Sequence, residues 1–188
     1  MNLTKQPDPI QKPVHLRQTE IKTYDLGHHQ VLVEATLQDT RTPPPAEKLP
    51  DGQMVLIHDL VARIRVQGPD LTIVGVEAEM PHIPREMCRE VLPDMQKLVG
   101  LRIISGYTQK VKNLIGDVKG CSHLTHLFLN LGPAAVQGYW AAYGRKPGAR
   151  SLANPAITRV IDSCRVWRRD GPLVRSLAAD DRKNPKGS

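Results

Sequence analysis

Aromatic residues are scarce in this chain, and long apolar runs are missing. Only 4% of its 188 residues are aromatic, with a single phenylalanine, so the core must be built from Leu, Val, Ile and Met. No stretch approaches the roughly 18 uninterrupted apolar residues of a membrane-spanning helix, and the N-terminal MNLTKQPDPIQKP lacks the apolar centre of a signal peptide. The hydrophobic content of 40% still suffices for one folded domain. We therefore expect a cytoplasmic globular protein.

Cysteines are also few, and several catalytic motifs are absent. Cys88, Cys121 and Cys164 are an odd number at wide spacing, so we expect reduced thiols and not a disulfide framework. The chain has no glycine-rich phosphate loop, no G-x-S-x-G elbow and no H-E-x-x-H pair. These absences exclude the commonest signatures of nucleotide-binding proteins, serine hydrolases and zinc proteases.

Acidic residues are scarce in the C-terminal quarter. Residues 145–188 carry eleven Lys or Arg against four Asp, so this segment accounts for the whole net charge of +7. Such a segment could bind nucleic acid or another polyanion, although a solvated basic face is the simpler explanation. Trp167 lies among three arginines, but the low aromatic content argues against base stacking and hence against a nucleic-acid partner.

Apolar and polar residues alternate over the first half, which predicts strands. Residues 14–24, 29–40, 54–66 and 71–80 are β-prone segments separated by turn signals. We expect them to form an antiparallel meander of about four strands within residues 13–82.

The second half changes to helical spacing over residues 84–168. Gly132-Pro133 is expected to interrupt a helix that begins near Cys121. The predicted fold class is α+β, with an N-terminal antiparallel β-meander packed against a C-terminal set of three to four helices. This single domain would span residues 13–178, between loose ends at 1–12 and 179–188.

His58 is the most suggestive histidine, because it alternates with apolar residues on one face of its strand. A register that pairs Val66 with Thr72 would place His58 opposite Met80 and His82 one diagonal step away. An imidazole on an apolar face needs a hydrogen-bond partner. It could be a core histidine bonded to a backbone carbonyl, or a base that works near neutral pH.

GDVKGCSHLTHLF, residues 116–128, concentrates reactive side chains at a predicted helix start. Ser122 is a suitable N-cap, so Cys121 would lie where free N–H groups and the helix dipole favour a thiolate. His123 and His126 follow, one turn apart. Cys121 could be a nucleophile, a metal ligand or a small buried packing residue.

If the chain binds a metal, the expected ligands are three thiols and one imidazole, which suit zinc or iron. That ligand set is Cys88, Cys121, His123 and Cys164.

Several fragments occur along the chain in a familiar order. They are VHLRQTEI, LQDT, IHDLVARIRV, Pro84 with Cys88, GCSHLTHL and DSCRVW. Together they resemble a bacterial family of unknown function, catalogued as number 2889, over roughly residues 14–170. The chain departs from the family pattern at TYDLGHHQ, at Ser122 and at His126, where the family more often has an acid. The resemblance implies a shared cluster of His and Cys side chains and a context of aromatic or acyl compound breakdown.

We therefore expect a small enzyme without a nucleotide cofactor, whose catalytic residues are His58, Cys121 and His123 around one pocket. One histidine would be the general base, and Cys121 a nucleophile or a polarising neighbour. The expected reaction is an elimination, a carbon–carbon cleavage or a hydrolytic step on a small, anionic aromatic or acyl substrate. The candidates for substrate binding are Arg63, His82 and Asp59.

Two alternatives to an enzyme remain, a metal-binding protein and a polyanion-binding protein. A homo-oligomer is compatible with each of the three functions.

Overall fold

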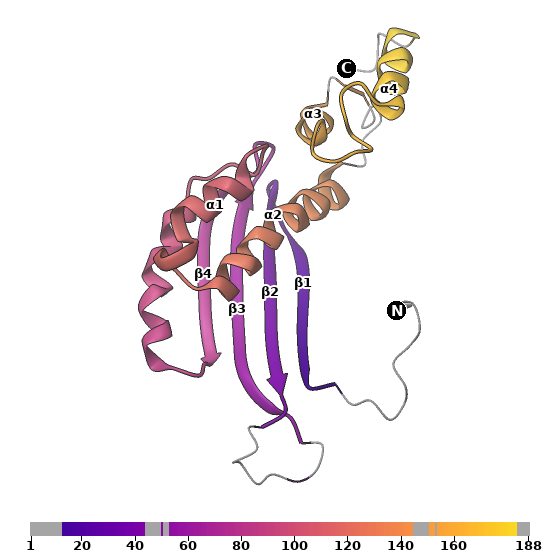
Figure 1. Ribbon diagram of the computed structural model, residues 1–188. Helices are drawn as coiled ribbons and strands as arrows, with labels where there is room; N and C mark the ends of the chain where they lie inside the picture. Colours follow the sequence, from indigo (N-terminus) through magenta and orange to yellow (C-terminus); the bar gives the residue numbers. More distant parts are fainter. Residues whose placement is uncertain (1–12, 44–49, 51–52, 145–150, 153, 184–188) are drawn as a thin grey trace.

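The computed structural model describes residues 13–43, 50, 53–144, 151–152 and 154–183. The predicted loose N-terminus at 1–12 lies outside these ranges. Four strands form one antiparallel sheet in the order of the sequence (Figure 1). They are β1 (His15–Gly27), β2 (Gln30–Arg41), β3 (Val55–Gln67) and β4 (Thr72–His82). The predicted β-meander is therefore confirmed.

One face of the sheet is covered by helices, and the core lies between them (Figure 1). The helices are η1 (Glu86–Leu98, a 3₁₀ helix), α1 (Tyr107–Ile115), the short η2 (Asp117–Lys119) and α2 (Ser122–Tyr143). Apolar side chains at alternate positions of β2 and β3 point into this core, as a half-buried antiparallel sheet requires. The predicted α+β class is confirmed.

The register between β3 and β4 differs from the predicted one. Val66 pairs with Ile73 and not with Thr72, because irregularities after Arg65 and after Asp59 each shift the pairing. A bulge adds an unpaired residue to one strand and changes which face the following residues occupy. As a result His82 pairs with Asp59 and is exposed. The expected meeting of His82 with His58 on the buried face is therefore wrong.

Helix α2 is continuous through Gly132-Pro133, where the sequence predicted an interruption. Proline removes one intrahelical donor, but buried residues on both sides of it, including Leu131 and Ala135, hold this helix against the sheet. Gly132 also lies against the ring of Tyr107, where a Cβ atom would come within 2.4 Å of Cε1. Tertiary packing thus overrides the local helix-breaking signal.

The C-terminal part forms two further helices beyond the end of α2, α3 (Pro155–Val160) and α4 (Pro172–Lys183) (Figure 1). Ile157, Val174 and Leu177 are buried there. Helix α4 continues to Lys183, so the predicted loose segment from residue 179 begins inside a helix. Across the described residues, no helix is long and apolar enough to cross a membrane.

Candidate functional site

A carboxylate continues the apolar stripe of β2 at its C-terminal end. The stripe runs Val31, Val33, Ala35, Leu37 and then Asp39, which is only 2% exposed. Asp39 lies directly opposite His58 on β3, and the register shifts immediately after it. Strand alternation therefore places an acid and an imidazole side by side on the face that the helices cover.

Arg17 on β1 fixes this carboxylate from the other neighbouring strand. Its Nε donates to Oδ1 of Asp39 and its Nη2 to Oδ2, each at 2.6 Å, which is a bidentate pair. His15 Nε2 lies 3.3 Å from Oδ1. The hydrogen bond from Arg17 is the main reason why the pKa of Asp39 falls to about 2, despite the opposing effect of burial. Asp39 is therefore ionised at neutral pH.

His58 donates its Nδ1–H to Oδ2 of Asp39, because the two atoms are 3.2 Å apart and an ionised carboxylate only accepts. In neutral His58 this bond leaves the lone pair on Nε2, the nitrogen that points away from the acid. The side chain of His58 is 16% exposed, so the imidazole is not fully enclosed in the core.

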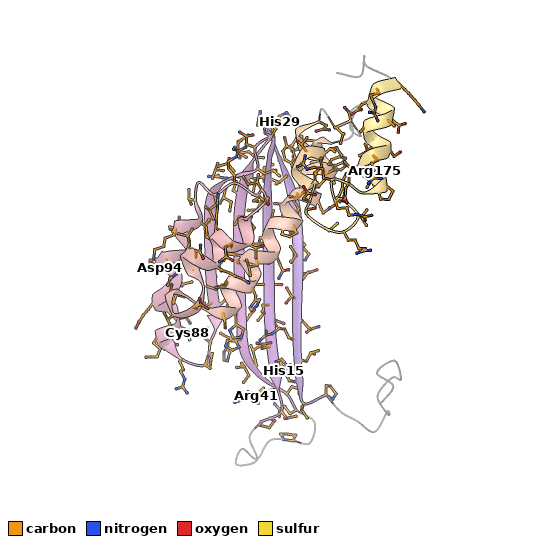
Figure 2. All side chains as sticks on the ribbon, turned by 45° about the horizontal axis from the view of Figure 1, so that its top comes forward. His15, His29, Arg41, Cys88, Asp94 and Arg175 are labelled. Carbon is orange, nitrogen blue, oxygen red and sulfur yellow. The ribbon has the colours of Figure 1, made fainter. Side chains whose placement is uncertain are left out.

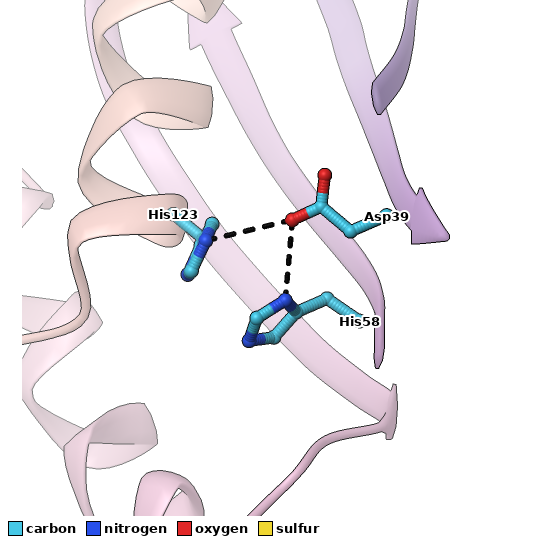
Figure 3. Close-up of side chains that lie close together, drawn as sticks. All are labelled: Asp39, His58 and His123. Carbon is cyan, nitrogen blue, oxygen red and sulfur yellow. Dashed lines mark hydrogen bonds and ion pairs between the residues drawn. The ribbon is translucent and has the colours of Figure 1, made fainter. Parts of the chain in front are cut away.

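His123, in the first turn of α2, completes the group (Figure 3). Its Nε2 lies 3.6 Å from Oδ2 of Asp39, and its ring centroid lies 4.1 Å from that of His58. Burial is the main cause that lowers the pKa of His123, and the positive charges of His58 and Arg17 add to it. His123 is therefore mainly neutral near pH 7.

Cys121 is the N-cap of α2, one residue earlier than the predicted cap at Ser122. Its carbonyl accepts from the N–H of Thr125, and its Sγ lies 3.8 Å from His123 Nδ1. The preceding Gly120 must be glycine, because a Cβ there would come within 2.3 Å of the Ile115 carbonyl oxygen. This tight turn brings the thiol and the imidazole to the same helix end.

The sequence-predicted catalytic residues His58, Cys121 and His123 thus lie together, while the predicted substrate-binding residues do not join them. Arg63 lies on the opposite face of the sheet, where it forms ion pairs with three glutamates. These are Glu34 at 2.6 Å, Glu77 at 3.7 Å and Glu79. Asp59 lies on that same face, paired with His82. Strand alternation turns these residues away from His58, which corrects the prediction that they share its site.

The metal-ligand geometry also differs from the predicted thiol-rich set. In the part of the chain that the structure describes, one group of His, Cys, Asp and Glu brings its ligand atoms within 4.8 Å of one another, namely Asp39, His58 and His123. Figure 2 shows Cys88 on η1, on the β4 side of the sheet, whereas His15 lies on the β1 side. Cys164 is exposed in the C-terminal part. Cys121 therefore lies beside His123, but Cys88 and Cys164 do not complete a metal site with them.

Sequence reasoning missed Asp39, Arg17 and His15, although all three lie inside fragments that carried the family resemblance. One signal was available for Asp39. In VLVEATLQDT it occupies the next position of the alternation that buries Val31 to Leu37, and an acid on a buried face requires a partner. Nothing local in the sequence indicated that this partner would be Arg17, which is 22 residues away.

The comparison with known families agrees with the resemblance noted above. A family model described as "Protein of unknown function (DUF2889)" matches residues 15–137, a range that includes the whole sheet, Asp39, His58 and His123. No curated protein and no solved structure shows detectable similarity. The chain therefore belongs to the DUF2889 family.

Proposed function

We propose that this chain is a small-molecule enzyme in which the Asp39–His58 pair and His123 transfer protons during a lyase or hydrolase step. The observation that carries the proposal is a buried carboxylate, locked by Arg17, in contact with two partly exposed imidazoles. A buried carboxylate requires such charged and hydrogen-bonding partners, and clusters of this kind concentrate at functional sites. A cytoplasmic location remains part of the proposal.

In the proposed mechanism His58 is the base and His123 is a proton relay. Asp39 orients His58 so that its Nε2 can accept a proton from a substrate, and the carboxylate then stabilises the imidazolium. The rings of His58 and His123 are 4.1 Å apart, so two positive charges on them would repel each other. A proton on His58 therefore keeps His123 neutral. His123 can in turn relay a proton to or from a leaving group.

Cys121 adds a thiol beside His123. A neutral imidazole 3.8 Å from Sγ is placed to accept the thiol proton as the sulfur attacks a substrate. This supports a nucleophilic role in a hydrolytic step, or a polarising role in an elimination.

The substrate would be small and anionic, of the aromatic or acyl class. Arg17, whose side chain is 44% exposed, contributes positive charge at this end of the sheet, whereas the charge of Arg63 is neutralised by glutamates on the opposite face. Arg17 can therefore face a substrate anion while it holds Asp39.

The proposal is tested with a panel of aromatic and acyl carboxylates and thioesters. The variants are His58→Gln and His123→Gln, and the matched control is His126→Gln. His126 is exposed one turn further along α2, and its Nδ1–H donates to the Ser122 carbonyl. We expect both site variants to lose about 100-fold or more of the turnover, while the control keeps it. Equal turnover in all three variants would exclude the assignment.

Divalent metal binding is a second candidate, favoured by the convergence of Asp39, His58 and His123. Two imidazoles and one carboxylate suit zinc or iron. The guanidinium of Arg17 on the same carboxylate opposes a cation, and this is why we place proton transfer first. Elemental analysis of untagged protein separates the two. A stoichiometric metal that is lost in His58→Gln and kept in His126→Gln would favour the metal centre.

Polyanion binding by residues 145–188 stays a prediction, and part of that range lies outside the described residues. Two of its arginines are already paired, Arg168 with Asp170 and Arg169 with Asp162. These ion pairs reduce the positive charge that is available to a polyanion.

A further inference from the structure

The outer edge of β1 has no partner strand among the described residues, because the sheet order begins at β1. The other edge of the sheet, formed by β4, is partly covered. Part of β4 is covered by residues 100–103, whose backbone bonds to Leu71 and Ile73. An unpaired edge offers a row of N–H and C=O groups to another strand. On β1 this row extends along 13 residues (Figure 1).

The side chains of β1 on the face away from the helices form a row of six exposed residues, which we call the β1 outer row. They are Leu16, Gln18, Glu20, Lys22, Tyr24 and Leu26. Its three apolar members are 44–46% exposed, and among the described residues neither β2 nor β3 exposes a large apolar side chain to this extent. Exposed apolar side chains gathered on an edge strand indicate a contact surface.

The β1 outer row is complementary to itself about Ile21. We propose that two copies of this chain pair their β1 strands antiparallel across a two-fold axis at Ile21. Glu20 then faces Lys22 of the second copy, and Gln18 faces Tyr24 of the second copy. Each pair occurs twice, as a two-fold axis requires. Leu26 lies at the irregularity between Asp25 and Gly27, at the end of the regular pairing. Charges on an edge strand usually oppose pairing, but here the two charges of opposite sign meet across the axis.

Charge also selects this register over its neighbours. A shift of the axis by one residue toward the N-terminus places Glu20 opposite its own copy. A shift by one residue the other way places Lys22 opposite its own copy. Like charges directly opposite each other destabilise a strand pair. Glu20 and Lys22 already form an ion pair with each other on β1, at 2.7 Å. Pairing centred on Ile21 is the register in which the second copy adds a further opposite charge to each of them.

The same pairing brings the second copy close to the candidate site. On the helix-covered face, Arg17 would face Asp25 of the second copy. Arg17 is the residue that locks Asp39, so the interface would add a carboxylate beside it. The two sheets would become one sheet of eight strands, with the helices of both copies on the same face.

Sedimentation of the full chain across the micromolar range tests the proposal. We expect a dimer whose dissociation constant rises about tenfold or more in Glu20→Lys, because two attractive pairs become repulsive. The double variant Glu20→Lys/Lys22→Glu restores opposite charges across the axis and should restore the dimer. Circular dichroism verifies that each variant is folded. A wild-type chain that stays monomeric, or a dimer that is insensitive to Glu20→Lys, would overturn the proposal.

Disulfide cross-linking tests the register of the proposed β1–β1 pair separately. In a Cys164→Ser background, which removes an exposed thiol, Ile21→Cys lies on the axis and should form a disulfide with its own copy on mild oxidation. Thr19→Cys would lie opposite Thr23 of the second copy and should not cross-link to itself. Efficient cross-linking of Thr19→Cys without Ile21→Cys would contradict the axis at Ile21.

Discussion

Asp39→Asn is the most informative single substitution, because it removes one charge and little else from the candidate site. Asparagine resembles the protonated aspartic acid in shape, so Arg17 and His58 lose an ionised acceptor but not the packing around it. The pKa of Asp39 falls from 3.8 to about 2 in the folded chain, mainly through the hydrogen bond from Arg17. Ionised Asp39 therefore stabilises the fold.

The magnitude and the pH range follow from that change in pKa. A shift of this size is worth about 2 kcal/mol of unfolding free energy at pH 7. The sign is that of a depressed carboxyl pKa. The stabilisation is fully present above pH 3.8 and is lost as the pH falls toward 2. For a chain of this length we expect Asp39→Asn to lower the melting temperature by about 5 °C at neutral pH.

Urea unfolding followed by circular dichroism, at several pH values between 2 and 7, measures the effect. The wild type should lose its advantage over Asp39→Asn as the solution is acidified. Asp59→Asn is the matched control, because Asp59 lies at the same end of the sheet on the opposite face. We expect this control to change the unfolding free energy by less than about 0.5 kcal/mol. An advantage of the wild type that does not change with pH would refute the reasoning.

Three further substitutions test the packing of the helices on the sheet and on one another, each by urea or thermal unfolding. Gly68→Ala should cost about 2 kcal/mol, since a Cβ there would lie 2.0 Å from Cε2 of Tyr139; no loss would show that this ring can move freely. Gly132→Ala should destabilise by a similar amount despite the helix propensity of alanine, because its Cβ meets the buried ring of Tyr107; a gain in stability would contradict this contact. Tyr107→Phe should cost about 1 kcal/mol, because it removes the 2.8 Å hydrogen bond to the Phe128 carbonyl; an unchanged midpoint would mean that this bond contributes nothing.

The parts of the fold that depend on local periodicity could be predicted from the sequence. Alternation identified the four strands, and the buried face of β3 carries His58 as expected. The start of α2 was placed within one residue of Ser122. The β3–β4 register could not be predicted, because bulges after Asp59 and Arg65 leave no clear mark in the local pattern. The continuity of α2 through Pro133 depends on packing against the sheet, which the sequence near Pro133 does not reveal.

The candidate site could be predicted only in part, for a related reason. His58, Cys121 and His123 were identified by residue type and by their places in a strand and at a helix start. Asp39 was missed because an acid at the end of an apolar alternation resembles the polar end of a strand. Its partner Arg17 depends on the pairing of β1 with β2, which is a long-range contact that periodicity does not specify.

The central claim is that Asp39 orients His58 as a base beside a neutral His123, and ¹⁵N NMR of histidine-labelled protein tests it most directly. We predict that neutral His58 carries its proton on Nδ1, and that His123 titrates below its ordinary pKa of 6.5. In Asp39→Asn the pKa of His123 should fall further, because a nearby negative charge that raises it is removed. A proton on Nε2 of His58, together with a pKa of His123 at or above 6.5, would contradict the account.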